Sequence, residues 1–412
     1  MQMPEPDHQI IARRDAICAA LRQLVPAASV VSSVEGRRAY DADGLSAYRQ
    51  LPLAVVLPET VEQIAAVMKY CHAEGIKVVP RGAGTSLSGG ALPLADAVLL
   101  GLGKFNRILD IDYANRCVVA QPGVTNLAIT HAVQDQGFYY APDPSSQIAC
   151  SVGGNVAENS GGVHCLKYGL TTNNLLGIEL VTIEGEILRL GGKHLDSGDY
   201  DLMGVMTGSE GLLGIVSEVT LRILQKPATQ RALLVGFDDT AAAATAVGDV
   251  IGAGIIPAGM EMMDSLAINA AEDFVHAGYP RDAAALIIVE LDGPAVEVDA
   301  LIERVAKIMD RAGASSLKVS TSEDERNLFW AGRKSAFPAV GRISPDYLCM
   351  DGTIPRRRLP DMLVLMATLS QKYGLRVANV FHAGDGNLHP LILFDANQPG
   401  ELARAEDFGA DI

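Results

Sequence analysis

A glycine-rich stretch from Pro80 to Gly90 carries the residue types best suited to binding a phosphate group. Its small residues let consecutive backbone N–H groups approach an anion closely, and Thr85, Ser86 and Ser88 add hydroxyl groups. Arg81 adds a positive charge at the start of the stretch. This combination indicates a loop that cradles a pyrophosphate, but a glycine loop with a purely structural role explains the same residues equally well.

The pattern differs from the two commonest nucleotide-binding glycine motifs. A Rossmann fingerprint needs a third glycine where the chain has Leu87, and a helix directly behind it, where Pro93 soon follows. The Gly-Lys-Ser/Thr end of a Walker loop is missing as well. The stretch is therefore expected to follow a strand and to open no helix.

A second segment, Pro142 to Gly162, lacks any apolar periodicity and is followed by Lys167-Tyr168-Gly169. A segment of this length inside a compact domain is typical of a binding loop or of disorder. A third glycine-rich piece, Gly208 to Val216, leads into an alternating strand. An ordered binding loop is favoured for the second segment, because the flanking pieces show strand or helix patterns: 118–121, 125–136 and 178–183.

Two histidines flank an Asp-Gly pair in the segment Asn379 to His389. Asp385-Gly386 is a favoured two-residue hairpin turn, and pairing outward from it sets His382 opposite His389. With about 5 Å between cross-strand Cβ atoms, both imidazoles can reach one divalent ion. For a lone pair of histidines on a hairpin, stacked or hydrogen-bonded side chains are the commoner arrangement, so these residues alone favour a structural role.

The elements that must position these residues divide the chain near residue 228. Residues 1–50 are expected to form an N-terminal helical segment, and residues 51–228 an α+β domain. Residues 229–412 are expected to form a second domain, in which strands alternate with helices and predict an antiparallel sheet covered on one side, as in ferredoxin-like folds. Helices are predicted over 10–24, after Thr60, over 240–251 and 298–312 and after Ser322; strands are predicted over 53–57, 76–79, 219–223, 232–237 and 284–291.

Composition is typical of a soluble cytoplasmic enzyme. The 412 residues are enough for two or three domains, and the net charge of −16 disfavours nucleic acid and anionic membranes as partners. No run of about 18 apolar residues exists, and the N-terminus lacks a basic-then-apolar signal, so neither export nor a membrane span is expected. The 6 cysteines contain no Cys-x-x-Cys pair that would build an iron–sulfur cluster or a structural zinc site, and reduced thiols are expected at Cys18, Cys71, Cys117, Cys150, Cys165 and Cys349.

Taken in order, the three glycine-rich pieces resemble the FAD-binding domain of the vanillyl-alcohol oxidase/p-cresol methylhydroxylase (PCMH) type. Over nearly its whole length the chain is similar to the family that contains the FAD-linked subunit of bacterial glycolate oxidase and its D-lactate and D-2-hydroxyglutarate dehydrogenase relatives. The resemblance implies an α+β fold, with a two-subdomain PCMH-type FAD-binding domain and a ferredoxin-like α+β cap domain. It also implies FAD-dependent oxidation of a small 2-hydroxy acid, glycolate or D-lactate, with hydride transfer to the flavin and electrons passed to a separate acceptor.

The resemblance further implies which residues hold FAD. The first loop would cradle the pyrophosphate, the 142–162 segment would pass the flavin, and Glu210 to Ile215 would lie near the adenine and ribose. Some relatives tether FAD covalently through a histidine of the first loop; this chain has Thr85 there, so noncovalent FAD is expected. The implied cofactor-binding residues are Pro80, Arg81, Gly82, Ala83, Gly84, Thr85, Ser86, Gly89, Pro142, Asp143, Ser145, Gly153, Gly154, Asn155, Asn159, Gly161, Gly162, Tyr168, Glu210, Gly211, Gly214 and Ile215.

For the substrate, the resemblance assigns catalytic roles to Arg333, His382 and His389. The relatives' His-x-Gly-Asp-Gly-Asn-x-His motif supplies two ligands to a divalent metal, zinc or manganese, so His382 and His389 become metal ligands. The arginine of a Trp-x-x-Arg motif binds the substrate carboxylate, which points to Arg333; from residue type alone, an exposed helix arginine is the alternative. Cys349 stands where some relatives place a substrate-contacting lysine, which favours a small acid over a long dicarboxylate.

In the relatives a Ser-Gly-Glu-His-Gly segment follows this motif and supplies the third metal ligand and the catalytic base. The chain ends at Ile412 before such a segment, and residues 403–412 look like the first turns of a helix. A C-terminally truncated version is therefore expected, and a noncatalytic flavin-binding fragment is the alternative to the enzyme. The expected partners are other oxidase subunits or an electron carrier, an iron–sulfur subunit or a quinone, which would also allow a peripheral place at the inner membrane.

Overall fold

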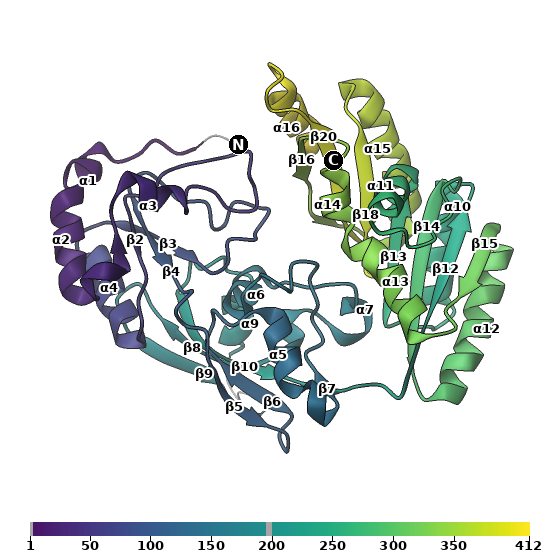
Figure 1. Ribbon diagram of the computed structural model, residues 1–412, viewed down its shortest axis with the longest axis horizontal. Helices are drawn as coiled ribbons and strands as arrows, with labels where there is room; N and C mark the ends of the chain where they lie inside the picture. Colours follow the sequence, from purple (N-terminus) through teal and green to yellow (C-terminus); the bar gives the residue numbers. More distant parts are fainter. Residues whose placement is uncertain (1–2, 195–199) are drawn as a thin grey trace. The chain divides into compact units, whose positions relative to one another are not determined.

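The computed structural model describes residues 3–194 and 200–412, which divide into two compact units. The first unit contains the chain up to Gly161 and residues 169–226. The second contains Pro227–Ile412 together with the short piece Gly162–Tyr168, which includes helix α7 (Cys165–Tyr168) (Figure 1). The sequence patterns gave no sign that this piece leaves the first unit. None of the helices in the described ranges is long and apolar enough to cross a membrane.

The first unit is built around two sheets. A four-stranded sheet has the order β1-β2-β4-β3, and a five-stranded antiparallel sheet has the order β5-β6-β10-β8-β9. Strands β7 and β11 form a separate pair. The strands are β1 (Val30–Val31), β2 (Ala54–Val56), β3 (Lys77–Arg81), β4 (Ala97–Gly101), β5 (Ile108–Asp112), β6 (Cys117–Ala120), β7 (Phe138–Tyr139), β8 (Leu175–Val181), β9 (Ile187–Gly191), β10 (Ile215–Arg222) and β11 (Leu224–Gln225).

Each sheet of the first unit carries its own apolar core. The first core joins the four-stranded sheet to three helices (α1, α2 and α4), and the second joins the five-stranded sheet to three others (α5, α6 and α9). In the first core the predicted cap is present, because the Thr60 hydroxyl accepts a hydrogen bond from the N–H of Gln63 at 3.4 Å. The helices are α1 (His8–Ala12), α2 (Arg14–Leu24), α3 (Val34–Arg38), α4 (Val61–Ala73), α5 (Asn126–Val133), α6 (Val152–Glu158), α8 (Thr171–Asn174) and α9 (Leu202–Met206), with 3₁₀ turns η1 (Ala27–Ser29) and η2 (Gln134–Gln136).

The prediction that residues 142–162 form an irregular loop throughout is wrong for their middle part, which is helix α6. Ser151 begins the helix, and its hydroxyl accepts from the N–H of Gly154 at 3.3 Å. The adjacent glycines conceal the helix in the sequence. Gly153 is required by packing, since a Cβ there would lie 2.4 Å from Cβ of Pro122.

The second unit is built on a seven-stranded antiparallel sheet of order β15-β12-β14-β13-β18-β20-β16 (Figure 1). The strands are β12 (Thr229–Phe237), β13 (Gly259–Asp264), β14 (Ala285–Gly293), β15 (Ala314–Val319), β16 (Asp346–Cys349), β18 (Val377–Phe381) and β20 (Pro390–Phe394), with β17 (Gly352–Thr353) and β19 (Asn387–Leu388) as a separate pair.

Helices cover both faces of this sheet, whereas the sequence predicted cover on one side only. Residues from α10, α12 and α15 belong to one apolar cluster with the sheet, and residues from α11, α13 and α14 belong to another. The second layer was missed because α11 and α14 were not recognised in the sequence. The helices are α10 (Thr240–Gly252), α11 (Ser265–Val275), α12 (Ala295–Arg311), α13 (Glu323–Lys334), α14 (Ala336–Val340), α15 (Leu359–Tyr373) and α16 (Glu401–Asp411), with the 3₁₀ turn η3 (Arg356–Arg358).

Strand alternation decides which side chains reach the second helical layer. Met260 and Met262 of β13 pack into the cluster with α10, α12 and α15, whereas Met263 packs into the cluster with α11, α13 and α14. Because successive side chains point to opposite faces of a sheet, Glu261 shares the face of Met263. A carboxylate is thus placed among the apolar residues that pack against α13.

Candidate functional site

Three glycine-rich pieces, far apart in the sequence, come together in the first unit. A Cβ on Gly82 would lie 2.3 Å from Oγ of Ser151, and a Cβ on Gly211 would lie 2.2 Å from Cγ of Pro80. The third piece is also tied to α6, because the N–H of Glu210 donates to the carbonyl of Ala157 at 2.8 Å. The predicted convergence of the three pieces is therefore present in the structure.

The loop after β3 presents the donors that a pyrophosphate needs. In the part of the chain that the structure describes, the backbone N–H groups of residues 83–87 donate to no backbone oxygen. Gly84 has a φ of +71°, which favours glycine, and a Cβ there would lie 2.3 Å from the guanidinium of Arg81. A loop with uncommitted N–H groups and an arginine folded over it fits the pyrophosphate of FAD.

Carboxylates surround the far end of the same loop. Glu158 and Glu210 both approach Gly90, at 3.0 and 3.2 Å from the position of its absent Cβ. Burial raises the pKa of Glu158, and the charge of Glu210 adds to this effect. Asp43 is buried nearby, and burial raises its pKa although the charge of Arg81 opposes the shift. Carboxylate oxygens near a dinucleotide suit its ribose hydroxyl groups, which are donors.

The remaining predicted cofactor residues fall into two groups. Pro142 and Asn155 are brought together by Asn126, whose side-chain amide donates to the carbonyl of Pro142 and to the amide oxygen of Asn155, both at 3.0 Å. Gly162 and Tyr168 belong to the second unit. The others stay in the first unit, near the ends of its elements: Asp143, Ser145, Gly161, Gly214 and Ile215 in loops or at the start of β10, Gly153 and Gly154 in α6, and Asn159 at the end of α6.

The second unit buries the predicted carboxylate-binding arginine. Helix α13 begins at the predicted cap, where the Ser322 hydroxyl accepts from the N–H of Glu325 at 3.2 Å, and it places Arg333 in its last turn with 1% of its surface exposed. The alternative of an exposed helix arginine is therefore wrong. Arg333 forms an ion pair with Glu261 at 2.6 Å, but among the described residues none of its guanidinium nitrogens has an aligned hydrogen-bond partner.

His382 and His389 lie next to each other, with ring centroids 4.9 Å apart and ring planes at 86°. The predicted two-residue turn is wrong, because His382 bridges Asn387 and β18 pairs with β20 through Asn379 and Pro390. The turn therefore spans residues 383–386. The N–H of Gly384 in this turn donates to the carbonyl of Met260 on β13 at 2.9 Å. Because His382 is opposite Asn387, the two histidines are diagonal neighbours and not opposite ones.

Glu261 is the residue of this site that the sequence analysis missed. Both of its carboxylate oxygens lie 2.9 Å from Nδ1 of His382, and Oε2 also lies 2.6 Å from the guanidinium of Arg333. The only available signal was an acidic residue within the apolar run Gly259–Asp264, because a charge inside a buried strand calls for a partner.

The two histidines have opposite electrostatic environments. Burial alone lowers the pKa of His382, but the charge and hydrogen bond of Glu261 outweigh it and raise the pKa above the ordinary value. Burial lowers the pKa of His389 well below its ordinary value, and the charges of His382 and Arg333 add to this effect. His389 is therefore a neutral imidazole near pH 7 and has a lone pair to offer a ligand.

The same geometry bears on the predicted metal. Nδ1 of His382 faces Glu261 at 2.9 Å and Nδ1 of His389 faces Asp351 at 3.7 Å, which leaves Nε2 of both rings for a ligand. Within residues 3–194 and 200–412, however, no group of three or more His, Cys, Asp or Glu side chains is arranged to hold a metal. The donor set thus fits two ligands of a metal and not a complete site.

Cys349, which the resemblance sets at the position of a substrate-contacting lysine in some relatives, lies on edge strand β16. Cys349 pairs with Leu391 of β20, and burial raises the pKa of its thiol to about 12. The thiol is therefore neutral and offers no charge to a second carboxylate. The six cysteines all lie within the described residues and form no disulfide there, and five of them are buried.

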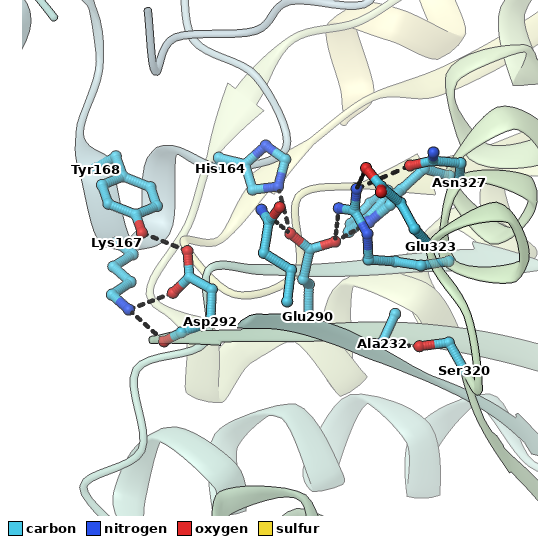
Figure 2. A network of polar contacts seen from close by, with 12 residues as sticks. His164, Lys167, Tyr168, Ala232, Glu290, Asp292, Ser320, Glu323 and Asn327 are labelled. Carbon is cyan, nitrogen blue, oxygen red and sulfur yellow. Dashed lines mark hydrogen bonds and ion pairs between the residues drawn. The ribbon is translucent and has the colours of Figure 1, made fainter. Parts of the chain in front are cut away.

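A second polar network joins residues 162–168 to the sheet and to α13 (Figure 2). Glu290 of β14, which is fully buried, lies 3.1 Å from Nε2 of His164 and accepts from Arg326 at 3.0 Å and from the indole of Trp330. Burial raises the pKa of Glu290, but these partners outweigh it and lower the pKa to about 2. The network anchors the helix that carries Arg333.

Asp292, two residues further along β14, holds the end of the same short piece. Its carboxylate accepts from the ammonium of Lys167 and from the hydroxyl of Tyr168, and its carbonyl accepts from Lys167 at 3.0 Å (Figure 2). Tyr168, predicted to contact FAD, thus has a structural partner in the second unit.

Comparisons with known proteins agree with this arrangement. Residues 52–191 match the FAD binding domain family, and residues 226–412 match the C-terminal domain of FAD linked oxidases. The glycolate oxidase subunit GlcD of Escherichia coli (strain K12) is 59% identical over 97% of this chain and 80% of its own length. A D-lactate dehydrogenase of Anaerostipes hadrus is 30% identical over 88% of this chain and 80% of its own length.

The solved structures support the fold. The structure of p-cresol methylhydroxylase with bound substrate has a TM-score of 0.81 to this chain, at 17% identity, and the match covers 99% of this chain and 88% of the other. At this identity the likeness concerns the fold alone. The predicted α+β fold class with a PCMH-type FAD-binding domain is confirmed, and FAD is the cofactor of the matched domain.

Proposed function

Because the chain belongs to the family of FAD-linked oxidases that includes the glycolate oxidase subunit GlcD, and is thus an FAD-dependent hydroxy acid oxidoreductase, we propose that its substrate is a small 2-hydroxy acid, glycolate or D-lactate. The product is the corresponding 2-oxo acid. Bound FAD supplies the hydride acceptor for the α-carbon.

The observation that carries this proposal is the state of Arg333. The Arg333 guanidinium is buried, with 1% of the residue exposed, and its ion pair with Glu261 includes no aligned hydrogen bond among the described residues, so N–H donors are left for a further acceptor. A carboxylate satisfies a guanidinium through two parallel N–H···O bonds. We therefore assign Arg333 to the carboxylate of the substrate.

The neighbouring histidines supply the contacts for the other end of a small acid. Glu261 contacts both Arg333 and His382, so the arginine and the histidine pair belong to one cluster that suits a ligand with a carboxylate and an adjacent hydroxyl group. We propose that Nε2 of His382 and Nε2 of His389 serve as two ligands of a divalent metal, zinc or manganese, which would polarise the substrate hydroxyl. The neutral thiol of Cys349 favours an acid with a single carboxylate.

In the first unit, we propose that the cofactor-binding residues named from the sequence hold FAD without a covalent bond. The loop after β3 would bind the pyrophosphate through its N–H groups and Arg81, and Glu158 joins the predicted Glu210 as an acceptor for ribose hydroxyl groups. The side chain of Thr85 has no nitrogen atom with which to form the covalent link that a histidine forms in some relatives.

The proposal extends to organisation and partners. We assign residues 51–228 to FAD binding and residues 229–412 to substrate binding, with 1–50 as an N-terminal segment. GlcD is named as a subunit of glycolate oxidase, which supports the proposal that this chain also has partner subunits. The proposed partners are other oxidase subunits or an electron carrier, such as an iron–sulfur subunit or a quinone. We place the protein in the cytoplasm, with contact to the inner membrane through such partners.

Substrate choice is tested by the rate at which different acids bleach the flavin without oxygen. Glycolate, D-lactate and D-2-hydroxyglutarate are each mixed with the flavin-loaded protein under anaerobic conditions. The proposal expects reduction by a small acid at least ~10-fold faster than by D-2-hydroxyglutarate, since a pocket without a partner for the second carboxylate desolvates that charge at a cost. Faster reduction by the dicarboxylate would overturn the assignment of a small acid.

A further inference from the structure

Glu261 stands at the centre of the substrate cluster, although no sequence motif marks it. It lies on β13 between Met260 and Met262 and has 2% of its surface exposed. Its carboxylate contacts Arg333 at 2.6 Å and Nδ1 of His382 at 2.9 Å. It is therefore a buried anion shared by two residues that are assigned to substrate binding.

The backbone explains why this carboxylate meets both partners. In the β13–β18 register Met262 is opposite Phe381, and continuing this register by one residue sets Glu261 opposite His382. Both side chains then point to the face of the sheet that packs against α13, whose last turn carries Arg333. An ion pair between Glu261 and Arg333 thus joins the strand to the helix, beside the apolar packing of neighbouring residues.

We infer that Glu261 is a positioning residue, which holds the guanidinium of Arg333 in place for the substrate carboxylate and fixes His382 with Nε2 as its ligand-binding nitrogen. The inference rests on the roles proposed for Arg333 and His382. It adds a residue that acts through these two and that touches neither substrate nor cofactor itself.

The chemistry of the contact requires a carboxylate. Arg333 has only N–H donors, and Nδ1 of His382 must carry a proton if Nε2 is to bind a ligand, so both partners need an acceptor. A carboxylate has two acceptor oxygens and compensates the buried positive charge. The equally large side chain of glutamine has one acceptor oxygen and turns an NH₂ group toward a partner that is itself a donor.

The test is a double-mutant cycle on oxalate binding, with Glu261→Gln, Arg333→Ala and the double variant in the flavin-loaded full chain. Oxalate is the probe because it is a small carboxylate that flavin cannot oxidise by hydride removal, and its binding is followed through the visible spectrum of the flavin. Glu261→Gln is expected to raise the Kd of oxalate at least ~10-fold in the parent background and less than ~3-fold in the Arg333→Ala background, because its effect passes through Arg333.

A matched control separates positioning from general loss of stability. Asp292→Asn removes the charge of another buried acid, on the adjacent strand β14, whose carboxylate contacts Lys167 and Tyr168. This change is expected to leave oxalate binding within ~2-fold of the parent. If Glu261→Gln does not accumulate as flavin-loaded protein, Glu261→Asp takes its place in the same cycle. This variant keeps the negative charge but, with a side chain one methylene shorter, moves the carboxylate away from Arg333 and His382.

The outcomes distinguish this inference from the proposed function. Unchanged or tighter oxalate binding in Glu261→Gln would overturn the positioning role of Glu261, and so would an equal loss of oxalate affinity in both backgrounds. The role of Arg333 in binding the carboxylate would stand in either case. A parent protein that binds no oxalate, or an Arg333→Ala variant that binds it as the parent does, would overturn the proposed function and this inference with it.

Discussion

The rings of His382 and His389 lie edge to face with their centroids 4.9 Å apart, although neither residue is the cross-strand partner of the other. His382 bridges Asn387, so His389 reaches it on the diagonal. This arrangement depends on a turn of four residues, 383–386, which the carbonyl of Met260 fastens to β13. The closeness of the two imidazoles is therefore set by a third strand as well as by their own hairpin.

The first prediction concerns Arg333. Replacing it by alanine is expected to weaken oxalate binding ~10- to 100-fold, since a buried carboxylate loses a charged partner. FAD content should stay within error of the parent, because Arg333 belongs to the second unit and the glycine-rich loops to the first. Arg357→Ala, a change of an exposed arginine in the same unit, is the control. Equal oxalate affinity in all three proteins would remove Arg333 from the site.

The second prediction concerns the bond to the cofactor. The resemblance sets Thr85 at the position where some relatives link FAD through a histidine, and a threonine hydroxyl is not expected to form such a link. Acid precipitation of the purified protein is expected to release the yellow colour into the supernatant. A pellet that stays yellow after repeated washing with acid would show a covalent flavin and would contradict this assignment.

The third prediction uses two adjacent glycines of α6. A Cβ on Gly153 would lie 2.4 Å from Cβ of Pro122 and 3.1 Å from its backbone oxygen, and neither neighbour can rotate away. Gly153→Ala is therefore expected to destabilise the first unit by about 1–3 kcal/mol and to lower its FAD content. Gly154→Ala meets only the Ser151 hydroxyl at 3.2 Å and should cost much less. Thermal midpoints of the two variants decide the matter, and equal values would show that packing on Pro122 is unimportant.

The fourth prediction concerns acid. The pKa of Glu290 is about 2 in the folded protein, below the value of about 4.3 for an unfolded glutamate. As the pH falls below about 4.3, the unfolded chain binds the proton first, so the folded state loses stability until the pH reaches about 2. Above this pH window, the ionised Glu290 side chain contributes on the order of 3 kcal/mol to the free energy of unfolding. The Glu290→Gln variant lacks this contribution.

Urea midpoints measured across this pH range test the effect, with Trp330, the single tryptophan, as the fluorescent reporter. The difference in urea midpoint between the parent and Glu290→Gln should be largest near neutral pH and should shrink as the pH falls toward 2. Glu303→Gln, at an exposed position of α12, is the control, and its urea midpoint should change with pH as that of the parent does. A gap between parent and Glu290→Gln that stays constant with pH would mean that Glu290 is not held as a carboxylate by His164 and Arg326.

Much of the architecture could be predicted because local signals coincide with the elements. Thr60 and Ser322 cap α4 and α13 as expected, and the strand predicted over 284–291 corresponds to β14 (Ala285–Gly293). The glycine-rich loop after β3 was also predicted to open no helix, and it opens none. These features depend on neighbours within a few residues, which the sequence displays directly.

The errors arose where distant residues decide the structure. Helix α6 contains Gly153 because of Pro122, which is far away in the sequence, so its glycines were read as loop residues. The hairpin register depends on Met260 of β13, and a favoured Asp-Gly turn could not reveal that contact. Glu261 was missed for the same reason, since its partners come from another strand and from a helix.

The most direct test of the account is anaerobic titration of the flavin-loaded protein with glycolate and with D-lactate, followed by the visible absorbance of the flavin. The account predicts that at least one of these acids bleaches the flavin with one equivalent of acid per flavin, and that Arg333→Ala slows the bleaching at least ~10-fold. A flavin that dithionite reduces at once but that neither acid bleaches would contradict the central claim that this protein oxidises a small 2-hydroxy acid.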